Sequence, residues 1–119
     1  MNLMDVNPDW AWAAYEPSTN SPWNLDAVAH LFRRGGFGAP RKRLVESVEN
    51  VPAEVVESLF SAEEPEAFQR EMQTLIRAAI ATGNVRQLAA QWVYRMLHTP
   101  APLKEKMTLF WHGHFATSD

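Results

Sequence analysis

The chain has 119 residues, of which 46% are hydrophobic, so its length fits a single domain with enough apolar material for a core. Its formal charge of −3 argues against a nucleic-acid surface, which needs a basic excess, and the absence of cysteine excludes disulfides and thiolate metal sites. It contains neither an apolar run of about 18 residues, the length of a membrane span, nor a recognisable signal peptide, so a soluble cytoplasmic protein is the default expectation.

The N-terminal segment, residues 1–23, combines three prolines with a run of small polar residues, a composition that resists regular structure. It also carries Trp10, Trp12 and Trp23, whereas disordered segments are poor in aromatic residues. We therefore predict an extended aromatic lasso whose tryptophans pack on the helices that follow. The helical domain is predicted over residues 24–119.

Three helices are predicted in the first half of this domain. The first begins after Asn24, whose side chain suits an N-cap, and ends before Gly35. Pro40 and Pro52 each suit the start of a helix and so predict the second and the third.

Two further helices are predicted from apolar residues that recur with the 3.6-residue helical period. The fourth helix follows Pro65 and ends at Gly83, a natural C-cap. The fifth, over residues 85–98, has one face that is apolar at every expected position: Val85, Leu88, Ala89, Trp92, Val93, Met96 and Leu97. This regularity makes the fifth helix the most strongly indicated element of the chain.

A sixth helix is predicted after Pro102. Its apolar side carries Leu103, Met107, Phe110 and Trp111. We predict a core in which four side chains bury one another: Trp92, Met96, Phe110 and Trp111. No period-two alternation supports a strand, so the predicted fold is all-α, with about six short-to-medium helices that pack irregularly behind the aromatic segment.

The pair His112 and His114 is the first candidate for chemistry, because two imidazoles close together can bind a metal. On a helix, side chains two residues apart point about 200° apart and cannot hold one ion, whereas a break at Gly113 would restore the pair. The helical pattern favours a structural role, with His114 buried beside Phe110 and Trp111. The alternative is a metal or catalytic role shared with residues outside this chain.

A cluster of cations around a glycine-rich loop is the second candidate. It comprises Arg33, Arg34, Arg41, Lys42 and Arg43. Cations in the first turn of a helix oppose its dipole by about 0.3 to 1 kcal/mol each, a cost that an anion bound by the loop amides would offset. The spacing is not that of a P-loop, and Lys42 or Arg43 can instead pair with Glu46. An anion site is therefore one hypothesis, and a solvated helix face is the other.

Four strings of the sequence together indicate a family. They are residues 10–12 (WAW), 22–25 (PWNL), 30–38 (HLFRRGGFG) and the distinctive 102–118 (PLKEKMTLFWHGHFATS). They resemble the N-terminal part of a large bacterial family catalogued as domain of unknown function 1800. The resemblance implies that relatives are longer, with further helical segments after the last string, and that many are exported. It implies no activity, cofactor or catalytic residue.

The predicted function is that of a helical structural or interaction segment of a larger bacterial protein. Self-association, or packing against later sequence, is expected through four residues of the sixth helix: Leu109, Phe110, Trp111 and Phe115. The alternative is part of a metal-assisted or hydrolytic enzyme whose site is completed by sequence outside this chain. No cofactor is predicted, and no serine-hydrolase motif is present to suggest a catalytic residue.

Overall fold

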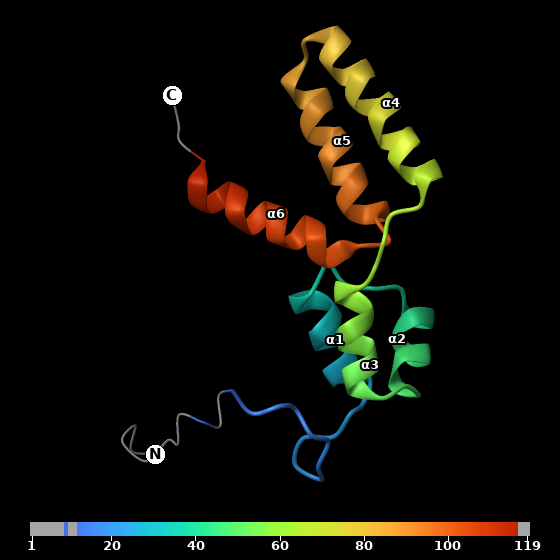
Figure 1. Ribbon diagram of the computed structural model, residues 1–119, viewed down its shortest axis with the longest axis vertical. Helices are drawn as coiled ribbons and strands as arrows, with labels where there is room; N and C mark the ends of the chain where they lie inside the picture. The colour runs from blue at the N-terminus through green and yellow to red at the C-terminus, as the bar shows by residue number, and fades with distance from the viewer. Residues whose placement is uncertain (1–8, 10–11, 117–119) are drawn as a thin grey trace.

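The computed structural model describes Asp9 and residues 12–116, and the statements below concern these residues. Their regular structure consists of six α-helices without a strand, so the predicted all-α class and the number of helices are confirmed (Figure 1). The molecule is elongated, with principal extents of 57 × 37 × 20 Å and a radius of gyration of 18.5 Å. A compact chain of this length would have a radius of gyration of about 13.5 Å.

Three short helices form one end of the molecule. They are α1 (Leu25–Arg34), α2 (Arg41–Val48) and α3 (Pro52–Phe60). The Asn24 side chain caps α1 by accepting the Ala27 N–H at 3.0 Å, as its residue type predicted. Four apolar residues from α1 and α3 form the buried core of this body: Val28, Phe32, Val55 and Leu59.

The segment before α1 agrees only in part with the prediction of an aromatic lasso that packs on the helices. Trp23 packs against the core of the α1–α3 body, and its indole N–H donates to the Ser47 carbonyl at 3.2 Å. Trp12, in contrast, is 89% exposed. The segment before α1, to which it belongs, extends away from the helices (Figure 1). The packing prediction is therefore confirmed for Trp23 and wrong for Trp12, whereas Trp10 lies outside the described residues.

The glycines after α1 allow close packing. A Cβ atom on Gly35 would lie 2.8 Å from the Leu59 side chain, and one on Gly36 would lie 2.9 Å from the Pro102 Cβ. Gly38 has a φ of +96°, a conformation that residues with a side chain rarely adopt. The glycine-rich loop thus brings the end of α1 against α3 and against the start of the last helix, and this packing explains its composition.

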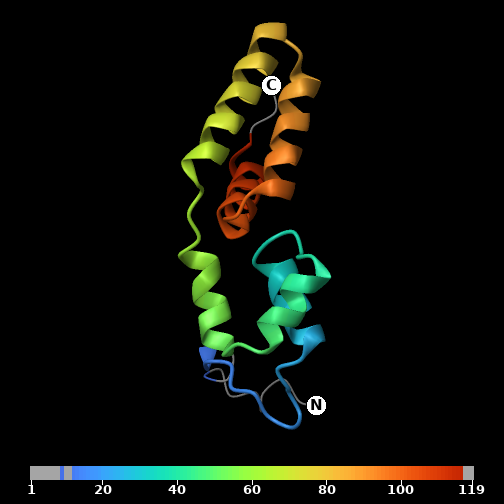
Figure 2. The same ribbon diagram turned by 90° about the vertical axis from the view of Figure 1, so that its right-hand side faces the viewer.

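Two longer helices form an antiparallel hairpin at the other end of the long axis (Figures 1 and 2). They are α4 (Glu66–Thr82) and α5 (Val85–His98). Gly83, with a φ of +63°, ends α4, and the Asn84 side chain caps α5 by accepting the Arg86 N–H at 3.0 Å. The Tyr94 hydroxyl donates to Glu71 at 2.8 Å across the hairpin, and this hydrogen bond raises the pKa of Tyr94.

The apolar stripe predicted on α5 is only partly covered. The polar and ring contacts of α5 with α4 come from residues outside the stripe: Gln91 with Met72, Tyr94 with Glu71, and Arg95 with the Phe68 ring. No residue of α5 is buried, and four members of the stripe are between 45% and 78% exposed: Val85, Leu88, Val93 and Leu97. The helical period correctly predicted the helix, but the stripe finds little cover within the described residues.

The last helix, α6 (Pro102–Phe115), runs away from the junction between the two ends (Figure 1). Its start is buried at Ala101, Pro102 and Glu105, whereas every residue from Met107 to Ala116 is exposed. No helix in the described part of the chain has both the length and the apolar character needed to span a bilayer. Within the described residues, α6 is therefore buried only at its start.

Candidate functional site

The start of α6 is anchored by a polar cluster around Arg95, which we call the Arg95 cluster. It comprises Glu64, Trp92, Arg95, Thr99 and Glu105. The Arg95 Nε donates to Glu105 at 2.6 Å, and its Nη2 lies 2.7 Å from both carboxylate oxygens of Glu64. The Trp92 indole N–H donates to the second Glu105 oxygen at 3.2 Å, and the Thr99 hydroxyl donates to Glu64 at 3.0 Å.

The Arg95 cluster is buried and its charges are paired. The Glu64 and Glu105 side chains are only 5% and 6% exposed, and the Arg95 side chain is 20% exposed. Burial alone lowers the pKa of Arg95, but the hydrogen bonds and charges of Glu105 and Glu64 outweigh it, so the pKa is raised and the cation is stabilised. Because each carboxylate is already engaged, the cluster resembles a structural brace more than an acid–base site.

The brace joins three segments that are distant in the sequence: the α3–α4 linker, α5 and α6. Sequence reasoning missed it, since Glu64 was one of eight glutamates between residues 46 and 71. The partners of Arg95 lie 31 and 10 residues away along the chain. Side chains that pair on one helix are three or four residues apart, so these larger separations gave no sign of the pairing in the sequence.

The exposed half of α6 carries a cluster of aromatic rings. Its residues Leu109, Phe110, Trp111 and Phe115, here called the aromatic face, are 39%, 56%, 46% and 70% exposed. The Trp111 and Phe115 rings stack with centroids 5.3 Å apart, and Phe110 meets Trp111 edge to face at 5.1 Å. These rings contact one another along the helix and are left open to solvent on their outer side.

The prediction that Trp92, Met96, Phe110 and Trp111 bury one another in a common core is wrong, since none of the four is buried. Helix α6 packs on α5 through Glu105 and through His112, whose ring meets Trp92 edge to face at 5.2 Å. That side of α6 is opposite the one chosen from the sequence. Trp92 and Met96 are half-buried, while Phe110 and Trp111 are 56% and 46% exposed.

The two candidate histidines lie on different sides of α6. The helix continues through Gly113, so no break brings His112 and His114 together. His112 contacts Trp92, and His114 belongs to the ring cluster, with Phe110 at 6.0 Å and Trp111 at 6.0 Å. Both are exposed, so the prediction of a buried His114 is wrong. No group of three or more metal-ligating side chains occurs within the described ranges.

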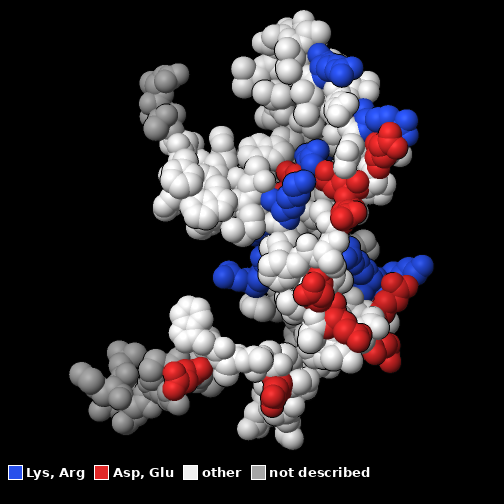
Figure 3. Space-filling view, in the orientation of Figure 1, with Lys and Arg blue, Asp and Glu red and all other residues white. Residues whose placement is uncertain are grey.

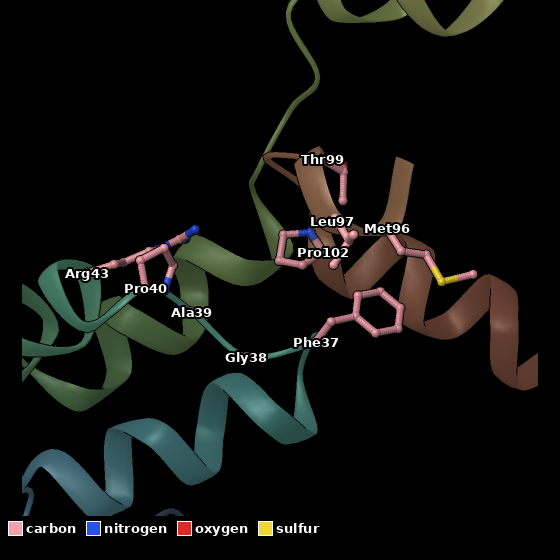
Figure 4. A pocket seen from close by; sticks show the side chains of 9 residues that line it. All are labelled: Phe37, Gly38, Ala39, Pro40, Arg43, Met96, Leu97, Thr99 and Pro102. Carbon is pink, nitrogen blue, oxygen red and sulfur yellow. The ribbon is translucent and has the colours of Figure 1, made fainter. Parts of the chain in front are cut away.

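Two of the five predicted anion-binding residues, Arg34 and Arg43, border different cavities. Arg33, Arg34, Arg41 and Lys42 are exposed, and Lys42 lies 3.9 Å from Glu46, the pairing that the sequence offered as the alternative. The Arg43 guanidinium lies over the Phe32 ring at 4.9 Å and borders a cavity of about 390 Å³ between the glycine-rich loop and the α5–α6 junction (Figure 4). Arg34 instead borders a different cavity between α1 and α3.

Anion binding by the loop stays a prediction. If it occurs, titration with phosphate should shift the backbone amide resonances of residues 36–43 before those of the rest of the chain, because the first-turn amides of α2 would donate to the anion. Arg41→Gln should weaken the response. An unchanged loop up to high millimolar phosphate would remove the hypothesis and leave a solvated helix face.

The comparisons with known proteins identify one family. The family model described as protein of unknown function (DUF1800) matches residues 30–119, whereas the comparisons with curated proteins and with solved structures found no match. The matched range contains two of the strings that carry the resemblance, residues 30–38 and 102–118, and thus both the glycine-rich loop and helix α6. Since this range covers more than half of the chain, the protein belongs to the DUF1800 family.

Proposed function

We propose that this chain acts as a helical interaction module and that a second copy of it binds to the aromatic face of α6. The observation that carries the proposal is the exposure of large apolar side chains on the second half of α6: Phe110, Trp111 and Phe115, whose rings contact one another, and Leu109. Contiguous exposed apolar surface of this kind typically marks an interface, because water contact with it is unfavourable.

The charge distribution favours a second copy as the partner. Residues 107–116 contain no Asp, Glu, Lys or Arg, and the exposed part of α6 forms an uncharged region in Figure 3. Two copies that meet face to face around a twofold axis would therefore bury no unpaired carboxylate or ammonium group. The formal charge of −3 per chain is also small enough to oppose association only weakly.

The side chains of the aromatic face would lose little conformational freedom when a second copy binds. The rings of Phe110, Trp111 and Phe115 already contact one another, so their side chains lose little conformational freedom when a partner covers them. Aromatic side chains are enriched in the centres of interfaces for this reason and for their large contact area. The opposite side of α6, with Glu105 and His112, is occupied by contacts to α5.

The alternative function, a metal-assisted or hydrolytic site, has less support. The two histidines lie on different sides of one helix, and the two buried carboxylates are held by Arg95. An interaction role uses the exposed apolar side chains of α6 and needs no unidentified ligand.

Light scattering coupled to size exclusion tests the proposal. The chain should show a molar mass that rises with concentration in the micromolar range, and the double variant Trp111→Ser/Phe115→Ser should remain a monomer. Phe60→Ser is a matched control, since Phe60 on α3 is 71% exposed, like Phe115 at 70%, but lies outside the aromatic face. A monomer at all concentrations, or a Phe60→Ser variant that dissociates as well, would contradict the proposal.

A further inference from the structure

A groove on the opposite end of the molecule from α5 has the composition of a small-molecule site. It lies between the N-terminal segment, α1 and α3, and its volume is about 650 Å³, within the range of roughly 300 to 1,000 Å³ that is usual for ligand pockets. Most of the side chains that line it are apolar: Ala14, Tyr15, Trp23, Ala27, Leu31, Pro52, Ala53 and Val56. Three polar residues complete the lining: Ser21, His30 and Arg34.

The two long walls of the groove are helices with small apolar side chains. Helix α1 turns Val28 and Phe32 into the protein core and presents a second face, with Ala27 and Leu31, to the groove. Helix α3 provides the facing wall, where Val56 is 38% exposed. The protein therefore covers Val56 only in part, and the side chain is open towards the groove.

Two aromatic rings line the groove near its N-terminal side, and both are held in place. The Tyr15 and Trp23 rings lie 6.0 Å apart at an angle of 51°. The Tyr15 hydroxyl donates to the Ser21 carbonyl at 2.9 Å, and the Trp23 indole N–H donates to the Ser47 carbonyl at 3.2 Å. Because the polar groups of both rings are satisfied within the protein, the rings offer a ligand only apolar contact.

Two polar side chains of the groove, His30 and Arg34, lie together on α1. His30 and Arg34 are four residues apart, so they share a face of the helix, and both are exposed. Within the described residues, neither has a carboxylate within 4.0 Å, whereas Lys42, Arg70 and Arg95 each have one. An unpaired guanidinium beside apolar walls is complementary to a planar carboxylate on an apolar molecule.

We propose that this groove binds a small amphipathic carboxylate, with its apolar body on the walls and its carboxylate on Arg34. His30, one turn earlier on α1, lies beside the same carboxylate. The volume excludes neither a linear nor a ring-shaped apolar body, so the shared chemistry is an apolar acid. This site is independent of the aromatic face of α6, and its test does not depend on the oligomeric state.

Decanoate is a suitable probe, and decan-1-ol is its uncharged counterpart. We expect decanoate, below its aggregation concentration, to shift the amide and methyl resonances of residues 27–34 and 53–56 and to bind at least tenfold more tightly than decan-1-ol. Arg34→Gln should weaken decanoate binding about tenfold, a change of about 1.4 kcal/mol. Arg33→Gln is the matched control, because Arg33 is the same residue type, adjacent in sequence and exposed, but does not line the groove.

A second variant tests the apolar wall. Ala53→Trp places a large side chain in the groove from an exposed position of α3, so it should abolish decanoate binding while the helical circular dichroism stays unchanged. Equal weakening by Arg33→Gln and Arg34→Gln would overturn the proposal, since it would indicate general electrostatic attraction. Equal affinity for the alcohol, binding that persists in Ala53→Trp, or resonance shifts confined to the aromatic face of α6 would also overturn it.

Discussion

Replacing Arg95 by methionine is expected to lower the free energy of unfolding by about 3 to 5 kcal/mol, because it leaves two buried carboxylates without their counter-ion. Glu64 and Glu105 retain only the Thr99 hydroxyl and the Trp92 indole N–H as partners, and their side chains are 5% and 6% exposed. The variant should also weaken the attachment between α5 and α6, since Glu105 would keep only the Trp92 indole N–H as its partner on α5.

Chemical denaturation followed by circular dichroism measures this loss. Arg70→Met is the matched control, because Arg70 pairs with Glu66 at 3.9 Å on the surface of α4, where both side chains are at least 70% exposed. Exposed pairs of this kind contribute about 0.5 kcal/mol or less. If the two methionine variants were equally stable, the Arg95 cluster would not be the brace that positions α6.

The substitution Gly36→Ala is expected to destabilise the chain by about 1 to 3 kcal/mol, as overpacking in a well-packed core does. The added Cβ would lie 2.9 Å from the Pro102 Cβ and 3.3 Å from the Phe32 carbonyl oxygen. Neither neighbour is the end of a flexible side chain, so the loop or the start of α6 must shift.

The substitution Gly113→Ala is a control for which the expected change in stability has the opposite sign. A Cβ atom on Gly113 would meet nothing within 4 Å, and the residue lies inside α6. Alanine favours a helix over glycine by about 0.8 to 1 kcal/mol, so this variant should be more stable than the parent chain. Thermal denaturation of both variants checks the pair of predictions, and a Gly36→Ala variant with unchanged stability would mean that the glycine-rich loop has room for a side chain.

The positions of the helices could be predicted because their ends are encoded locally. Asn24 and Asn84 cap α1 and α5 through their own side chains, and Gly83 ends α4 in a left-handed conformation. Pro52 and Pro102 begin α3 and α6 at the first turn, where the missing N–H costs nothing. Each of these signals acts within a few residues, so one sequence suffices to find it.

The faces that the helices bury were harder to predict. On α6, the aromatic residues favoured Phe110 and Trp111 as the core side, yet the buried anchor is the charged Glu105, which only the distant Arg95 makes tolerable. On α5, most of the apolar stripe is exposed, and the hydrogen bonds to α4 come from Gln91 and Tyr94, which lie outside the stripe. Periodicity identifies residues that share a face, but it does not say which partner covers that face.

The candidate sites show the same limit. The cations around the glycine-rich loop suggested one anion site, but Arg34 and Arg43 border different cavities, and the glycines are explained by packing against Leu59 and Pro102. The groove between α1 and α3 escaped the sequence because Tyr15 and Val56 are far apart in the chain. Only the fold brings their side chains to one surface.

Fluorine NMR of the chain labelled with 5-fluorotryptophan can show whether the aromatic face of α6 is an interface between copies. We expect the Trp111 resonance, assigned through a Trp111→Phe variant, to move as the protein is concentrated. Trp12 is an internal control, since it is 89% exposed and belongs to the segment before α1, which does not approach α6 (Figure 1), so its resonance should stay in place. A Trp111 resonance that does not depend on concentration, or one that moves together with that of Trp12, would contradict the claim.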